Sequence, residues 1–85
     1  MVIGVFFMKA CILIKTEPGK NRTIAKMVEK IEGVKIAFPV LGRADVVASI
    51  EVSTLEQLSV LAFNIGGIPG ITTTETLVGL EGVIE

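Results

Sequence analysis

The stretch Val40-Leu41-Gly42-Arg43-Ala44-Asp45 separates two strand-like runs near the middle of the 85-residue chain. Gly42 can adopt a positive φ at little cost, and tight turns need such a residue. The stretch therefore predicts the tip of a β-hairpin, where Arg43 and Asp45 place opposite charges at the end of a sheet. Two interpretations of this tip stay open: one half of a small-ligand site, or a turn with solvated charges.

The segments on either side of this turn alternate in the way that strands do. We predict strands over 34–41 and 45–52, and two more over 9–16 and 71–80. In the strand over 34–41, one face is expected to carry Val34, Ile36, Phe38 and Val40. Pro39 lacks an amide N–H, which places this strand at a sheet edge or a bulge.

Two further segments have the periodicity of amphipathic helices. The first is predicted over Asn21–Glu32, with Asn21 as N-cap and Gly33 as the stop. Its apolar positions are Ile24, Met27, Val28 and Ile31. The second begins at Ser53, which has the spacing of a capping box with Glu56. Its apolar positions are Leu55, Leu58, Leu61, Ala62 and Ile65.

The resulting order, β-α-β-β-α-β, predicts an α+β fold of the ferredoxin-like kind. Two βαβ units joined by the hairpin give a four-stranded antiparallel sheet with both helices on one face. The open face is expected to carry Cys11, Leu13, Ala37, Leu41 and Val47. Because 51% of this short chain is apolar, we expect a second copy to cover that face and form a dimeric α/β barrel.

The composition argues against several classes of function. The chain has no His, Tyr or Trp and a single cysteine, so it offers no nucleophile–base pair and no zinc cluster. We therefore predict no enzyme activity and no cofactor. A net charge of −1 and few aromatic residues argue against direct nucleic-acid binding. No apolar run has the length of a membrane span, and nothing calls for an oxidising compartment, so a cytoplasmic setting is expected.

The first seven residues, Met1–Phe7, are apolar but too short for a signal peptide. Met8-Lys9 has the character of a natural start. We therefore interpret residues 1–7 as an N-terminal extension with a non-native start, and residues 8–85 as the domain.

Three stretches together point to a family. The hairpin at 40–45, Ile68-Pro69-Gly70-Ile71 and Thr72-Thr73-Thr74-Glu75-Thr76 resemble the ligand-binding, or RAM, module of the Lrp/AsnC "feast/famine" transcription regulators. The likeness covers about residues 9–81 and includes the element order. It implies a module that dimerises through its sheets, assembles dimers into rings, and binds amino acids where dimers meet.

Full-length members of that family carry an N-terminal helix-turn-helix domain, for which this sequence has no room. The resemblance thus implies a stand-alone module that lacks DNA-binding equipment and modulates full-length Lrp/AsnC regulators by co-assembly. The family's effector-response positions correspond here to Pro39, Gly42, Asp45, Leu55, Leu77, Val78 and Gly79. Two positions depart from the family pattern. Ala44 stands where an aromatic residue is common, and Gly79 stands where a larger residue is common.

A free amino acid suits these residues chemically. Backbone N–H groups around Gly42 and the Arg43 side chain can bind its carboxylate. Asp45 can accept from its ammonium, a charged hydrogen bond of about 1.5–3 kcal/mol. Hydroxyls would come from Thr72 and Thr74, and an apolar wall from Leu55, Leu77 and Val78. Core packing is the alternative role of Leu55 and Val78, and plain strand propensity is that of Thr72 and Thr74.

Two other functions stay open on the residues alone. One is a structural oligomerisation partner that binds no effector, and the other is a small enzyme on the dimeric α/β barrel.

Overall fold

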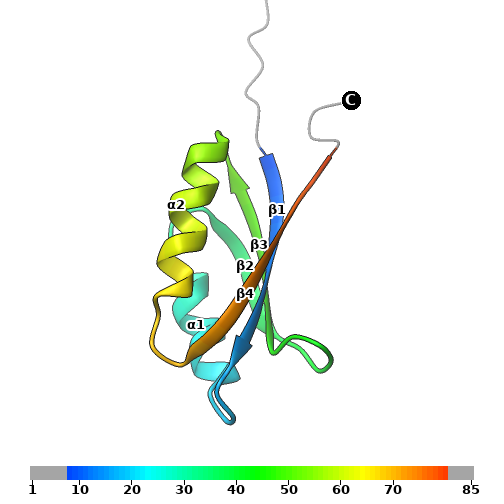
Figure 1. The fold of residues 1–85 in the computed structure, drawn as a ribbon, viewed down its shortest axis with the longest axis vertical. Coiled ribbons are helices and arrows are strands. Elements are labelled where there is room, and N and C mark those ends of the chain that lie inside the picture. Colours follow the sequence, from blue (N-terminus) through cyan, green and yellow to red (C-terminus); the bar gives the residue numbers. More distant parts are fainter. Residues whose placement is uncertain (1–7, 81–85) are drawn as a thin grey trace, which may run out of the picture.

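A computed structural model describes residues 8–80 and contains six elements. They are β1 (Met8–Thr16), α1 (Asn21–Glu29), β2 (Val34–Pro39), β3 (Val46–Val52), α2 (Leu55–Gly66) and β4 (Ile71–Val78). All strand pairs are antiparallel, in the order β2-β3-β1-β4 (Figure 1). The predicted element order and four-stranded antiparallel sheet are confirmed. The predicted extension over residues 1–7 lies outside the described residues.

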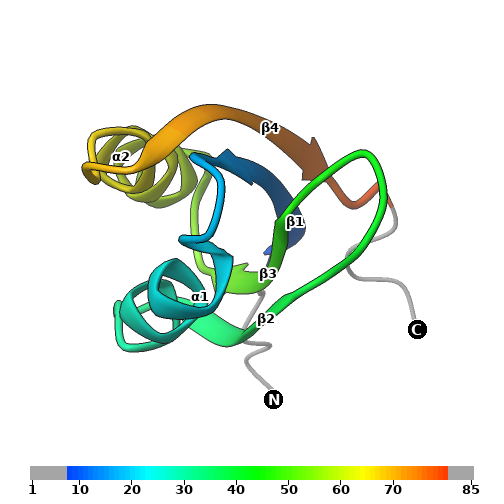
Figure 2. The same cartoon turned by 90° about the horizontal axis from the view of Figure 1, so that it is seen from below.

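Both helices pack on one face of the sheet, as Figure 2 shows in a view along the strands. The side chains between them are aliphatic and almost fully buried. From the strands the core takes Ala10, Ile12, Ile14, Ala37, Val46, Ala48, Ile50 and Val52, and from the helices Ile24, Ala25, Val28, Leu58, Leu61 and Ile65. No helix within residues 8–80 has the length and apolar character needed to cross a membrane.

In the edge strand β2, the side chains from Ile36 onward lie on the opposite faces of the sheet from those predicted by alternation. Val34 pairs with Ile50, but Ile36 pairs with Ser49, so the register slips by one residue between them. Such a bulge moves every following side chain to the other face. Ala37 is therefore buried under the helices, and the prediction that it lies on the open face is wrong. Ile36 and Phe38 lie on the open face instead, 46% and 43% exposed.

The predicted edge position of β2 is confirmed, and Pro39 is its last residue. Pro39 pairs with Val46 across the ladder. Its missing N–H therefore costs little, because an edge strand has a partner on one side only. Leu41 lies beyond the strand in the loop, where it is fully exposed.

The ends of α1 differ from the sequence prediction. The N-cap position is Lys20, not Asn21, and no side chain caps this helix. The Asn21 side-chain oxygen instead accepts a hydrogen bond from the backbone N–H of its neighbour Arg22, at 2.9 Å. The helix ends at Glu29, before the predicted Glu32, and Met27 is exposed rather than in the buried stripe.

The capping box of α2 is shifted by one residue from the predicted Ser53–Glu56 pair. Thr54 is the N-cap, and its hydroxyl accepts from the backbone N–H of Gln57 at 3.1 Å. The Gln57 side-chain oxygen accepts in return from the backbone N–H of Ser53 at 2.8 Å. This arrangement resembles a capping box, but Gln57 reaches the N–H of Ser53, one residue before the N-cap, instead of the N–H of Thr54. Leu55, the first helical residue, is consequently exposed.

Candidate ligand-binding site at the β2–β3 hairpin

The hairpin at 40–45 is fastened to the sheet through Asp45. The backbone N–H of Asp45 donates to the carbonyl of Ile14 at 2.8 Å, and its own carbonyl accepts from Val40 at 2.9 Å. Its carboxylate accepts from the backbone N–H of Thr16 at 2.8 Å. Two of these hydrogen bonds fix Asp45 to the end of β1, and the third, from Val40, closes the base of the hairpin itself.

The tip of the hairpin is free of such bonds. Gly42 has a φ of +150°, in the region that favours glycine, which confirms the role predicted for it. The backbone N–H groups of Gly42 and Arg43 donate to no acceptor within residues 8–80. Figure 2 shows that the hairpin projects away from the helices, past the open face of the sheet. These N–H groups are therefore available to an anion on that side.

A hollow of about 320 Å³ lies beside the hairpin. Its lining residues come from β1, the hairpin and β4: Leu13, Lys15, Arg43, Ala44, Thr73, Thr74 and Glu75. Arg43 and Thr74 were predicted as site residues. Lys15 and Glu75 were not, although the β1–β4 register places Lys15 opposite Thr73 and Leu13 opposite Glu75. These pairs belong to the regular part of the β1–β4 ladder, which shifts only beyond Lys15, and no local sequence pattern marks that pairing.

The predicted site residues form two groups at opposite ends of the sheet (Figure 1). The hairpin end holds Pro39, Gly42, Arg43, Asp45, Thr72 and Thr74, and the far end holds Leu55, Leu77, Val78 and Gly79. One small molecule cannot touch both groups in a single chain. A site made of both would need a second copy.

The hydroxyl of Thr72 is already used within the sheet. It donates to the carbonyl of Lys15 at 3.2 Å, at the point where the β1–β4 register shifts. This bond supports the alternative in which Thr72 has a structural role.

Gly79 has a structural reason to be glycine. Its backbone N–H donates to the carbonyl of Lys9 at 2.7 Å, and an added Cβ would stand 2.9 Å from that oxygen. A larger side chain would force the end of β4 away from β1. The departure from the family pattern at Gly79 is thus explained by close backbone approach.

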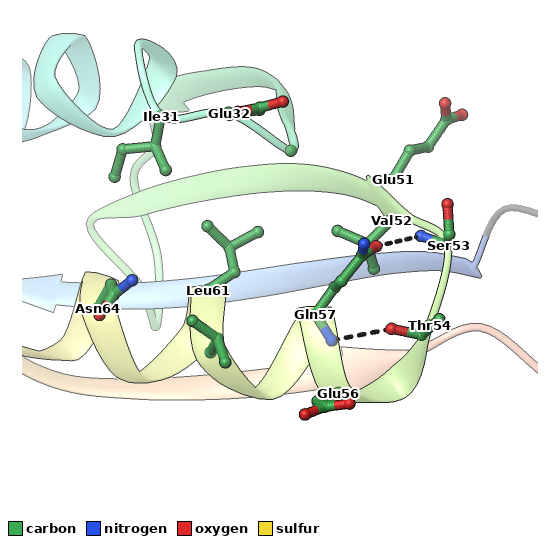
Figure 3. Close-up of a pocket in the computed structure, with 12 residues that line it drawn as sticks. Ile31, Glu32, Glu51, Val52, Ser53, Thr54, Glu56, Gln57, Leu61 and Asn64 are labelled. Atoms are coloured by element: carbon green, nitrogen blue, oxygen red, sulfur yellow. Dashed lines mark hydrogen bonds between the residues drawn. The ribbon is translucent and has the colours of Figure 1, made fainter.

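A larger groove, of about 1000 Å³, lies between the α1–β2 turn, the end of β3 and α2 (Figure 3). Figure 3 shows Ile31 and Leu61 pointing toward one another, whereas the carboxylates of Glu51 and Glu56 point away. The polar atoms of Thr54 at its rim serve the helix cap. The groove therefore lacks the converging polar groups that orient a small ligand.

Within residues 8–80, no three His, Cys, Asp or Glu side chains gather closely enough to hold a metal ion. The hairpin hollow, with Lys15, Arg43 and Glu75, is thus the described cavity whose charged side chains suit a small polar ligand.

Comparison with known proteins identifies the family of the chain. The family model described as the Lrp/AsnC ligand binding domain matches residues 9–85. Two curated relatives carry the name HTH-type transcriptional regulator FL11. The one from Pyrococcus abyssi is 33% identical over 76 residues, and the one from Pyrococcus horikoshii is 30% identical. Each match covers 89% of this chain but 50% of the relative, so the chain spans about half the length of these regulators.

Solved structures agree with this match. FFRP-DM1 is 30% identical with a TM-score of 0.80, and the match covers 86% of this chain and 99% of that one. The hypothetical protein PHS023 from Pyrococcus horikoshii gives the same identity and TM-score, over 86% and 89%. E. coli AsnC, at 19% identity, shares the fold with a TM-score of 0.82 over 100% of this chain and 61% of its own. The chain belongs to the Lrp/AsnC ligand-binding domain family.

Proposed function

We propose that this chain is an amino-acid-binding, oligomeric regulatory module of the cytoplasm. Two copies pack through their open sheet faces, dimers join into a larger ring, and the effector binds at the hairpin where copies meet. The module acts by co-assembling with full-length Lrp/AsnC regulators rather than by touching DNA. Its curated relatives are transcriptional regulators, which supports a regulatory and non-enzymatic role.

The uncovered apolar face of the sheet carries the assembly part of this proposal. Its side chains are Cys11, Leu13, Ile36, Phe38, Val47 and Leu77. Three of them, Ile36, Phe38 and Leu77, are exposed in the single chain. Because an isologous pair covers the same patch on both copies at once, a second copy is the simplest partner for this face.

The hairpin carries the effector part. The N–H groups of Gly42 and Arg43, together with the Arg43 guanidinium, suit a carboxylate. The split of the predicted residues between two ends of the sheet supports a site shared by two copies. Leu55 or Leu77 of one copy would then lie near the hairpin of another. A ligand of amino-acid size can reach roughly micromolar affinity within known ligand efficiencies.

The proposed co-assembly with full-length regulators is supported by the similarity of this chain to such regulators. The chain is 33% identical over 76 residues to half of the FL11 regulator from Pyrococcus abyssi, and its own residues 9–85 match the ligand-binding family. A regulator whose matching half has the same fold would offer the same sheet face for mixed pairing. Co-purification of a tagged full-length regulator with this chain tests it, and a regulator recovered alone would remove this part of the proposal.

Isothermal titration of the intact oligomer against the twenty amino acids tests effector binding. Saturable heat with at least one of them is expected. An oligomer of verified mass that gives no heat with any amino acid would contradict the proposal.

A structural partner without an effector is the second candidate, and the position of Asp45 favours it. The carboxylate of Asp45 already accepts from the backbone N–H of Thr16, so one of its two oxygens serves the fold. In that case the Asp45→Ala variant co-assembles with a regulator as the parent does, and the parent binds no amino acid.

A further inference from the structure

We propose that the hairpin hollow selects an acidic amino acid, aspartate or glutamate, over a neutral one. Lys15 and Arg43 each face one carboxylate of the ligand, and Glu75 faces its ammonium. This inference rests on the proposed function, because it names the effector class of the same site. It adds Lys15 and Glu75 as residues that determine specificity.

The charges on the walls carry the inference. The lining contains two cationic side chains and one carboxylate. An acidic amino acid carries the complementary set, with two carboxylates and one ammonium. A neutral amino acid would leave one of the two cations without a partner. A basic amino acid would add a second positive charge beside Lys15 and Arg43, and like charges at this range repel.

The three wall charges are not neutralised by one another. None of Lys15, Arg43 and Glu75 forms a salt bridge with a residue in the described part of the chain. Lys15 and Glu75 are diagonal neighbours on paired strands, since Lys15 lies opposite Thr73 and Glu75 opposite Leu13. Diagonal neighbours in an antiparallel pair are about 7–8 Å apart. Long side chains can bridge that distance, yet Lys15 and Glu75 form no ion pair here, so both charges are available to a ligand.

The size of the hollow fits the same ligand class. About 320 Å³ lies near the lower end of the roughly 300–1,000 Å³ that small-molecule sites occupy. Ala44, which is buried and lines the hollow, keeps this space open by its small side chain. An aromatic side chain in place of Ala44, as the family pattern has, would compete with a ligand for this space. Packing of a second copy on the open face would shield the charges from water and strengthen their interactions.

The direct test is titration of the unmodified oligomer with matched ligand pairs: L-glutamate against L-glutamine, and L-aspartate against L-asparagine. The amides have nearly the same shape but lack one charge. We expect at least one acid to bind about tenfold or more tightly than its amide, because a hydrogen bond to a charged group is lost. Glutamine and asparagine binding as tightly as the acids would overturn this inference and leave the proposed function standing. An oligomer that binds no amino acid at all would overturn both.

Three variants with matched controls assign the roles. Lys15→Gln and Arg43→Gln are each expected to weaken binding of the preferred acid about tenfold or more. Lys26→Gln and Arg22→Gln remove the same charges from exposed positions of α1, away from the hollow, and should leave binding unchanged. Equal losses in the α1 controls would mean that net charge alone governs binding, and would overturn the assignment.

Glu75→Gln tests the ammonium contact through a different readout. The parent is expected to prefer the acidic amino acid over the dicarboxylate of the same length without an ammonium, such as glutarate for glutamate. The variant should lose most of that preference, whereas Glu29→Gln on α1 should keep it. A preference unchanged by Glu75→Gln would overturn the role of Glu75. The mass of each variant's oligomer is checked first, and the unmodified protein's ligand series stands independently of the variants.

Discussion

The two faces of the sheet are built from the same strands but differ in what covers them. In β1, Ile12 and Ile14 are fully buried beneath the helices, whereas Cys11 and Leu13, which alternate with them, are only partly covered. In β2 the open face carries Ile36 and Phe38. Both faces are thus apolar, yet the chain supplies helices for one only. This contrast supports the proposal that another molecule covers the second face.

The largest effect is expected on the helix-covered face. Ile50→Ala removes a fully buried side chain from the centre of β3 and leaves a cavity. It should lower the free energy of unfolding by about 2–5 kcal/mol. Chemical denaturation at a fixed protein concentration measures this loss, since oligomer stability depends on concentration. A loss below about 1 kcal/mol would mean that this face is not the core.

Substitutions on the open face should weaken dimer formation rather than the folding of the single chain. Phe38→Asp places a charge in the proposed interface and should raise the dimer dissociation constant about 100-fold or more, which is about 2.7 kcal/mol. Phe63→Asp on α2 is the matched control, because Phe63 is 81% exposed on the other side of the molecule. Sedimentation equilibrium compares the two variants. Equal dimer affinities, or a shift in the Phe63 variant alone, would refute the assignment of the open face.

A smaller effect is expected at the end of the sheet, where Asp45 ties the hairpin to β1. Asp45→Ala removes the acceptor for the backbone N–H of Thr16 and should cost about 1–3 kcal/mol of unfolding free energy. Thr72→Val is a suitable comparison, because it removes the hydrogen bond from the Thr72 hydroxyl to the carbonyl of Lys15, at a more exposed site in the same region. If Asp45→Ala weakens effector binding without loss of stability, the carboxylate serves the ligand and not the hairpin.

The smallest effect concerns the cap of α2 on the covered side. Thr54→Ala should lower the free energy of unfolding by about 1 kcal/mol, because the hydrogen bond from the backbone N–H of Gln57 to the Thr54 hydroxyl is lost. Ser53→Ala should stay within about 0.5 kcal/mol, since it is the backbone of Ser53 that contacts Gln57. Thermal unfolding of the pair measures the difference. A larger loss for Ser53→Ala than for Thr54→Ala would mean that Ser53 is the N-cap, as the sequence predicted.

Much of the fold followed from local patterns. Alternation placed Cys11, Leu13 and Val47 on the open face correctly, because β1 and β3 pair without a bulge between them. The prediction for β2 was wrong from Ile36 onward. A bulge exchanges the two faces for all following side chains of the strand. No distinctive residue marks this bulge, so alternation alone cannot reveal it.

The candidate site was predictable in part for a related reason. Gly42 and Arg43 stand in one short loop, so sequence and resemblance both point to them. Lys15 and Glu75 are brought to the same hollow only by the register of β1 with β4, which includes a shift near Thr16. Pairing across more than 50 residues of chain is a tertiary property, and no local spacing encodes it.

The central claim is that a second copy covers the open face, and sedimentation velocity over a range of micromolar concentrations tests it most directly. We expect a species of twice the 9.0 kDa chain mass, or an even multiple of it. A single 9.0 kDa species throughout that range would contradict it.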